Sequence, residues 1–234
     1  MAELIVALDV PSGRQALALV DRLGGKVDVY KVGLELFTRE GPALVEELQS
    51  RGLKVFLDLK LHDIPNTVAG AARAAGDLGV EFLTVHACGG SRMLAAAHAA
   101  LEDSPTRLLA VTVLTSLSAD ELQESWGRSA LRPEEEVVRL AGHAWSSGVD
   151  GFVAAPPEVG LLRSELGVDP FIVTPGIRLE GDAADDQRRV ATPRSAVASG
   201  VDALVVGRSI TGAPDPVRAL ERIREEMNEE EQAE

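Results

Sequence analysis

The stretch Leu53-Lys54-Val55-Phe56-Leu57-Asp58-Leu59 is followed directly by Lys60-Leu61-His62-Asp63-Ile64-Pro65-Asn66-Thr67. The first seven residues form a nearly continuous apolar run, which predicts a buried strand. Pro65 suits the first turn of a helix, so the two stretches together predict a strand that gives way to a helix. A group of charged and polar side chains therefore stands at the carboxyl end of a buried strand.

The same change from strand to helix recurs along the chain. Apolar runs predict strands at residues 4–9, 27–33, 53–59, 82–87, 107–114, 151–155, 171–175 and 203–207. The predicted helices are residues 12–23, 41–51, 65–78, 90–101, 134–147, 157–166, 193–199 and 215–227. Strands that are apolar throughout are typical of a parallel sheet covered by helices. Eight such units predict an α/β protein with a single (β/α)8 TIM barrel, whose active site lies at the carboxyl ends of the strands.

Three segments fall outside this repeat. We expect residues 115–133 to form a loop with a short helix that begins at Ser118, and residues 177–192 to form a polar loop. We assign residues 1–224 to the barrel, and the Glu-rich residues 225–234 to a frayed tail. A doubly wound open sheet is the structural alternative, but such a sheet needs a Gly-rich turn after its first strand, and residues 9–13 do not form one.

Composition narrows the possible partners and the compartment. The formal net charge of −14, from 37 acidic and 23 basic residues, argues against nucleic acid or an anionic membrane as the main partner. Cys88 is the only cysteine, which excludes an intrachain disulfide and a cysteine cluster for zinc. The chain contains no apolar run of the ~18 residues that span a membrane and no basic leader before its first apolar run. We therefore expect a soluble cytoplasmic protein.

The charges that follow the third strand predict a working site. Alternation along a strand points Asp58 and Lys60 to the same side, and Asp63 follows within about one turn. A cation between two carboxylates stays protonated and held, because each charge pair at ~4 Å contributes about 4 kcal/mol at an effective dielectric of ~20. The alternative is a helix cap at Asp63 and a surface ion pair between Asp58 and Lys60, and such a pair stabilises a protein little.

A barrel brings other strand ends to the same mouth. These ends carry Asp9, Lys31, His86, Thr115 with Ser116, Pro175-Gly176-Ile177-Arg178, and Gly207-Arg208-Ser209. Two glycines let the backbone approach an anion and two arginines fork onto its oxygens, so the seventh and eighth strands predict a phosphate site. Placing Asp9, Lys31, Asp58, Lys60 and Asp63 in a row inside the mouth costs free energy, because the charges lose contact with water. Such a row therefore favours a functional role over a stabilising one.

The run from Asp58 to Thr67 closely resembles the D-x-K-x-x-D-I-P-N-T signature of the orotidine 5'-monophosphate decarboxylases, in their shorter bacterial form. The resemblance extends over most of the chain through Ala7-Leu8-Asp9, Tyr30-Lys31-Val32-Gly33, Val111-Thr112-Val113-Leu114-Thr115-Ser116, Thr174-Pro175-Gly176-Ile177-Arg178 and Val205-Val206-Gly207-Arg208-Ser209-Ile210. It implies decarboxylation of orotidine 5'-monophosphate (OMP) to UMP in pyrimidine synthesis, without a metal or another cofactor.

The resemblance also implies roles for individual residues. Lys60 would donate the proton, Asp58 would flank the C6 carboxylate, and Asp9 and Lys31 would contact the ribose and the other charges. Asp63 and Thr67 would reach the site of the second subunit of a homodimer. Thr115 and Ser116 would meet the pyrimidine. The phosphate would be held by Arg178, Gln187, Gly207 and Arg208, with residues 177–192 as a lid.

The same resemblance places the rest of the run near the substrate, namely Leu59, Leu61, His62, Ile64, Pro65 and Asn66, together with Pro175. Taken alone, His62 and His86 fit hydrogen-bonded packing residues better than functional ones. Two rival functions stay open: a magnesium-dependent phosphosugar decarboxylase or synthase that shares D-x-K-x-x-D, and a non-catalytic nucleotide-binding barrel. A chelator distinguishes the first rival, because its enediolate needs the metal, and binding without turnover would reveal the second.

Overall fold

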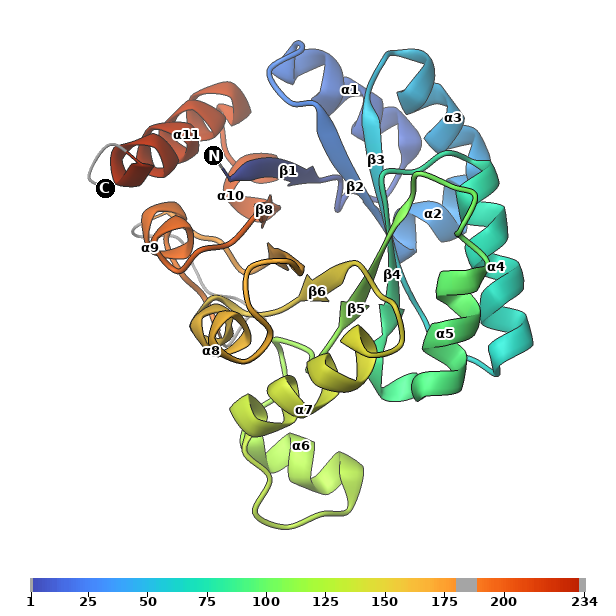
Figure 1. Ribbon diagram of the computed structural model, residues 1–234. Coiled ribbons are helices and arrows are strands. Elements are labelled where there is room, and N and C mark those ends of the chain that lie inside the picture. Colours follow the sequence, from blue (N-terminus) through green and yellow to red (C-terminus); the bar gives the residue numbers. More distant parts are fainter. Residues whose placement is uncertain (1, 180–188, 232–234) are drawn as a thin grey trace.

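Eight parallel strands close into a barrel in the computed structural model, which describes residues 2–179 and 189–231 (Figure 1). The strands are β1 (Glu3–Ala7), β2 (Val29–Gly33), β3 (Lys54–Leu61), β4 (Phe82–His86), β5 (Arg107–Val111), β6 (Gly151–Val153), β7 (Phe171–Thr174) and β8 (Ala203–Val206). Each strand pairs with the next along the chain, and β8 pairs with β1 from Glu3↔Ala203 to Val6↔Val206. The predicted TIM barrel is confirmed.

Helices form a ring around this barrel, and α6 stands outside the ring beyond α7 (Figure 1). They are α1 (Gly13–Leu23), α2 (Leu34–Glu40), α3 (Pro42–Ser50), α4 (Pro65–Asp77), α5 (Ser91–Ala99), α6 (Ala119–Trp126), α7 (Pro133–Trp145), α8 (Pro156–Leu166), α9 (Pro193–Ala198), α10 (Arg208–Thr211) and α11 (Pro216–Glu231), with a short 3-10 turn η1 (Ala87–Gly89). The sequence did not predict α2, because Leu36 is its only buried residue and gives no periodic pattern.

Two hydrophobic clusters hold the layers together. The barrel interior is filled by Ile5, Ala7, Val29, Phe56, Phe82, Leu109, Val173, Ala203 and Val205. A larger cluster lies between the strands and the helices, and each fully buried Leu, Ile, Val or Phe in it contributes about 1.5–3 kcal/mol. At the amino ends of the strands, the guanidinium of Arg107 lies 4.3 Å from the ring of Phe82 and 4.2 Å from that of Phe171. The interior is therefore packed, and space for a ligand is left at the carboxyl ends.

Some boundaries differ from those expected. β5 ends at Val111, so Thr115 and Ser116 lie on a loop beyond that strand. β6 ends at Val153, two residues earlier than predicted. The predicted helix after Ser118 is present as α6, with a capping box between Ser118 and Glu121. α11 continues to Glu231, so residues 225–231 are helical where a frayed tail was expected. Ile223 and Met227 explain this, because they lie one turn apart and are both buried.

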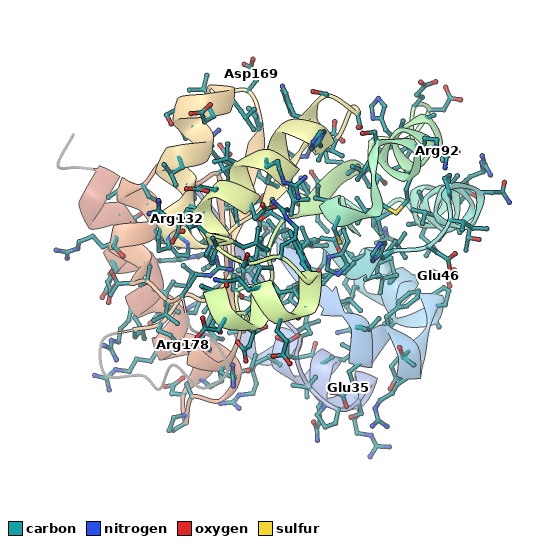
Figure 2. The ribbon with its side chains drawn as sticks, turned by 90° about the horizontal axis from the view of Figure 1, so that it is seen from below. Glu35, Glu46, Arg92, Arg132, Asp169 and Arg178 are labelled. Carbon is teal, nitrogen blue, oxygen red and sulfur yellow. The ribbon has the colours of Figure 1, made fainter. Side chains whose placement is uncertain are left out.

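The outer surface is strongly charged. Figure 2 shows charged side chains, among them Glu35, Glu46 and Asp169, spread over the helices and loops around the barrel. Within residues 2–179 and 189–231, no helix is long and apolar enough to cross a membrane.

Candidate active site

A cavity of about 290 Å³ opens at the carboxyl ends of the strands. Its lining residues come from seven of the eight strands or the loops that follow them: Ala7, Asp9, Lys31, Phe56, Asp58, Lys60, Val111, Val113, Leu114, Thr115, Ser116, Val153, Pro175, Gly176, Arg178, Val205, Gly207 and Arg208. Charged side chains from β1, β2 and β3 thus face a cavity whose other lining residues include apolar side chains from β5 and β6. Such a mixture is typical of a site for a small polar ligand.

Four of the predicted charges form a continuous row in this cavity. The ammonium of Lys31 lies 3.0 Å from Asp9 Oδ1 and 3.5 Å from Asp58 Oδ2, and Lys60 Nζ lies 2.7 Å from Asp58 Oδ1. Asp58 therefore stands between two ammonium groups. The side chains of Lys31 and Asp58 are only 11% and 12% exposed, whereas Lys60 is 34% exposed and faces the cavity.

The row keeps its two most buried members, Lys31 and Asp58, charged. Burial alone would raise the pKa of Asp58, but the ammonium groups of Lys31 and Lys60 outweigh burial and hold this pKa below its ordinary value. Burial likewise opposes the charge on Lys31, and the carboxylates of Asp58 and Asp9 overcome it, so the pKa of Lys31 is raised. The side chains of Asp9, Lys31, Asp58 and Lys60 therefore form a pattern of alternating charge.

Lys60 reaches this position through an unusual backbone conformation. Its φ is +52°, in the left-handed region, which costs a non-glycine residue roughly 1–2 kcal/mol. The pairing of β3 with β4 shifts register between Leu57 and Leu61, so regular alternation does not continue through Lys60. Regular alternation predicts that Asp58 and Lys60 turn to one side. Their side chains do meet, but a local irregularity of the strand brings them together.

Thr84 on β4 is a part of the site that the sequence reasoning missed. Its hydroxyl accepts a hydrogen bond from the Lys60 backbone N–H at 2.8 Å and donates one to Asp58 Oδ1 at 3.0 Å. Thr84 is fully buried, so one side chain supports both the strained backbone of Lys60 and the carboxylate beside it. The available signal was a threonine within the otherwise apolar run Phe82-Leu83-Thr84-Val85, because a buried hydroxyl needs a partner.

Asp63 does not join the row within its own chain. Its carboxylate accepts a hydrogen bond from the Ile64 backbone N–H at 2.6 Å, and it lines a separate surface hollow with His62, Ile64 and Pro65. The expectation of one cation between Asp58 and Asp63 is therefore wrong for the isolated chain. The reason is that β3 continues to Leu61, which carries the following turn away from the cavity.

The other members of the run also lie outside the cavity. Leu59 and Leu61 are partly buried and pack against the larger hydrophobic cluster, while Asn66 and Thr67 are exposed on the first turn of α4. The ring of His62 lies 5.6 Å from that of His86 at the end of β4. Burial, and then the nearby His62 and Lys60, lower the pKa of His86 below its ordinary value.

The ends of β7 and β8, which follow round the closed barrel to β1, carry the predicted anion-binding groups. Arg178 is 8% exposed, and its Nη1 donates to the Ile177 carbonyl at 2.9 Å. Gly176 adopts a φ of +79°, in the left-handed region that favours glycine, and Gly207 lies beside Asp9, where an added Cβ would be in ordinary contact at 3.4 Å from Asp9 Oδ2. Pro175, Arg178, Gly207 and Arg208 all line the cavity. Gln187 lies outside the described residues, together with most of the loop 177–192.

Thr115 and Ser116 also line the cavity, on the loop after β5, which β6 separates from β7 in the barrel. Val113 and Leu114 precede them and supply apolar surface suited to the face of a flat ring. In residues 2–179 and 189–231, no three His, Cys, Asp or Glu side chains are grouped to hold a metal ion.

Comparisons with known proteins place the chain among similar sequences and structures. The model of the Orotidine 5'-phosphate decarboxylase / HUMPS family matches residues 2–223. The orotidine 5'-phosphate decarboxylase of Halorhodospira halophila is 53% identical over 226 residues, covering 96% of this chain and 95% of the relative. That of Syntrophotalea carbinolica is 52% identical over 233 residues, covering 96% and 94%. The crystal structure of the orotidine 5'-phosphate decarboxylase from Lactobacillus acidophilus superposes with a TM-score of 0.86 at 42% identity, covering 97% of this chain and all of that one.

Proposed function

The chain belongs to the Orotidine 5'-phosphate decarboxylase / HUMPS family, and from this premise we infer that it is an orotidine-5'-phosphate decarboxylase. It converts OMP to UMP and CO2 in pyrimidine biosynthesis. The observation that carries the mechanism is the ammonium of Lys60, held 2.7 Å from Asp58 at the edge of the cavity. The family includes other activities, but relatives about half identical over nearly the whole chain are orotidine 5'-phosphate decarboxylases.

Loss of CO2 from C6 of the pyrimidine leaves an electron pair on that carbon, with no adjacent carbonyl to accept it. We propose that the Lys60 ammonium stabilises this carbanion and then transfers a proton to C6, which yields UMP. Lys60 afterwards recovers a proton from solvent, to which it is partly exposed. The ion pair with Asp58 holds the ammonium in a fixed position, so little reorganisation is needed as charge develops.

Asp58 has two roles in this proposal. Its carboxylate orients the ammonium of Lys60. We propose that it also repels the departing carboxylate of the substrate. We give more weight to the first role, because stabilisation that grows in the transition state raises the rate directly. Lys31 prevents Asp58 from taking up a proton and thereby preserves both effects.

Contacts far from C6 orient the substrate. We propose that Arg178, Arg208 and the backbone at Gly207 bind the phosphate, and that Gln187 adds a further contact. Asp9 and Lys31 would bind the ribose hydroxyls, and Thr115 with Ser116 the pyrimidine edge. Arginine and glycine at adjacent strand ends support the phosphate assignment, because a guanidinium forks onto phosphate oxygens and glycine lets the backbone approach.

We propose further that the active enzyme is a cytoplasmic homodimer with shared sites. Asp63 and Thr67 would then complete the partner's site, which agrees with their position outside the cavity of their own chain. Leu34 and Ile64 support this interface, since they follow the adjacent strands β2 and β3 and are 63% and 67% exposed. Apolar side chains of this size at neighbouring strand ends are typical of a surface covered by another chain.

A continuous absorbance assay of purified protein with OMP tests the activity. We expect formation of UMP at the same rate with and without a strong metal chelator. Loss of activity on chelation would favour a magnesium-dependent phosphosugar enzyme of the same barrel type. Binding of OMP or UMP without turnover would instead indicate a non-catalytic nucleotide-binding protein.

A further inference from the structure

Arg189 links two sides of the cavity through its side chain. Its Nη1 pairs with Glu158 Oε1 on the first turn of α8. Its Nη2 donates to the carbonyl oxygens of Val113 at 3.2 Å and Leu114 at 3.0 Å. Val113 and Leu114 line the cavity immediately before Thr115 and Ser116. The guanidinium thus holds the backbone that carries the proposed pyrimidine contacts.

Glu158 is a rigid anchor for this guanidinium. Its side chain is 1% exposed, and its second oxygen, Oε2, accepts a hydrogen bond from the Ala155 backbone N–H at 2.9 Å. Glu158 is therefore fixed at the junction between β6 and α8. A buried carboxylate of this kind favours a charged partner strongly, because an unpaired buried charge is costly.

The backbone beside Arg189 is joined to the phosphate side of the cavity. The Arg178 N–H donates to the Ala191 carbonyl at 2.9 Å, and the Ala191 N–H donates to the Gly176 carbonyl at 3.3 Å. Residues 189–191 therefore contact Arg178 through the main chain and the β5 loop through the Arg189 side chain. One short stretch connects the two ends of the site.

We propose that Arg189 is a positioning residue that sets the distance between the phosphate-binding and pyrimidine-binding ends of the cavity. This inference rests on the proposed function, because it assigns those two ends to parts of OMP. Arg189 itself does not line the cavity. It acts through the carbonyls of Val113 and Leu114, and a ligand that spans both ends depends on it more than a ligand that occupies one end.

The variant Arg189→Lys tests this role while keeping the charge. A single ammonium cannot reproduce a planar fork that bonds a carboxylate and two carbonyls at once. We expect the inhibition constant of UMP, which spans both ends, to rise about tenfold, as follows from loss of one charge-assisted hydrogen bond. The inhibition constant of ribose 5-phosphate, which lacks the base, should change by less than about twofold, because the bonds of Ala191 to Arg178 and Gly176 are main-chain bonds.

Arg163→Lys is a matched control at the other end of the barrel. The side chains of Arg163 and Arg189 are both 17% exposed. Arg163 likewise pairs with a carboxylate, Asp202 at 2.6 Å, and donates to the carbonyls of Pro170 and Gly200. The Arg163→Lys substitution should lower the melting temperature but leave the inhibition constants of UMP and ribose 5-phosphate unchanged. Equal changes for UMP and ribose 5-phosphate in Arg189→Lys, no change for either, or the same selective effect in Arg163→Lys would each overturn the proposal.

Glu158→Gln covers the case in which Arg189→Lys fails to fold. Glutamine still accepts from the Ala155 N–H but loses the charge that holds Arg189, so a smaller effect of the same selectivity is expected. An unchanged ratio of the two inhibition constants in a folded Glu158→Gln protein would overturn the proposal as well. Turnover of OMP by the unmodified protein is measured in parallel, and its absence would contradict the proposed function instead.

Discussion

Replacement of Thr84 by valine should damage catalysis although Thr84 never touches the cavity. Valine has nearly the same shape, so packing within the strand is kept while the hydroxyl is lost. The change removes an acceptor at 2.8 Å from the Lys60 N–H and a donor at 3.0 Å from Asp58 Oδ1. Both groups are held in place by this one oxygen, so the geometry of the proton donor depends on it.

The magnitude follows from these two bonds. A hydrogen bond to a charged group contributes about 1.5–3 kcal/mol, and one between neutral groups about 1 kcal/mol. The left-handed conformation of Lys60 costs roughly 1–2 kcal/mol and loses its support when the hydroxyl is removed. Since about 1.4 kcal/mol corresponds to a tenfold rate change, we expect kcat to fall about 10- to 100-fold, with a loss of unfolding free energy of about 2–3 kcal/mol.

Steady-state kinetics with OMP and urea unfolding measure the two effects. Thr174→Val is the matched control, because Thr174 is also fully buried near the end of a strand but its hydroxyl has no hydrogen-bond partner among the described residues. Removal of an unpaired buried hydroxyl should leave kcat unchanged and should not destabilise the protein. Thr84→Ser should recover most of the activity. A Thr84→Val enzyme with the kcat of the unmodified protein would refute the assignment of Thr84.

Three further outcomes are expected. Mixing inactive Lys60→Ala and Asp63→Ala chains should restore part of the activity through hybrid dimers, whereas no recovery despite proven subunit exchange would argue against shared sites. Stability should decrease as the pH falls below about 6.5, the ordinary pKa of histidine, because the lowered pKa of His86 makes the folded chain bind fewer protons than the unfolded one. His86→Gln should flatten this part of the melting-temperature profile, and an unchanged slope would exclude His86 as its source. Addition of a strong chelator should leave the rate of UMP formation unaltered, and a loss restored by magnesium would contradict the cofactor-independent mechanism.

The barrel could be predicted because its signal is local and repeated. Each strand is an apolar run bounded by turn residues, and eight such runs between helices leave few alternative folds. The residues that follow the strands could be assigned to the mouth by the same logic. Asp9, Lys31, Asp58 and Lys60 therefore appeared in the predicted site before their distances were known.

The remaining features depend on contacts between distant residues. Thr84 and Lys60 form a hydrogen bond although they are 24 residues apart in the sequence. No local sequence pattern predicts the register shift that brings them together. The position of Asp63 depends on how far β3 continues, which the sequence run 53–59 does not determine. α2 was not predicted, because a helix of seven residues with one buried side chain shows no periodic pattern of apolar residues.

The decisive measurement is the rate of OMP decarboxylation by Lys60→Ala, because one ammonium group is proposed both to stabilise the carbanion and to protonate it. Circular dichroism and UMP binding should show that the barrel and the phosphate side are intact, since Lys60 is 34% exposed and its removal leaves the core packing unchanged. We expect turnover to be abolished in this folded, ligand-binding protein. Turnover close to that of the unmodified enzyme would contradict this proposal.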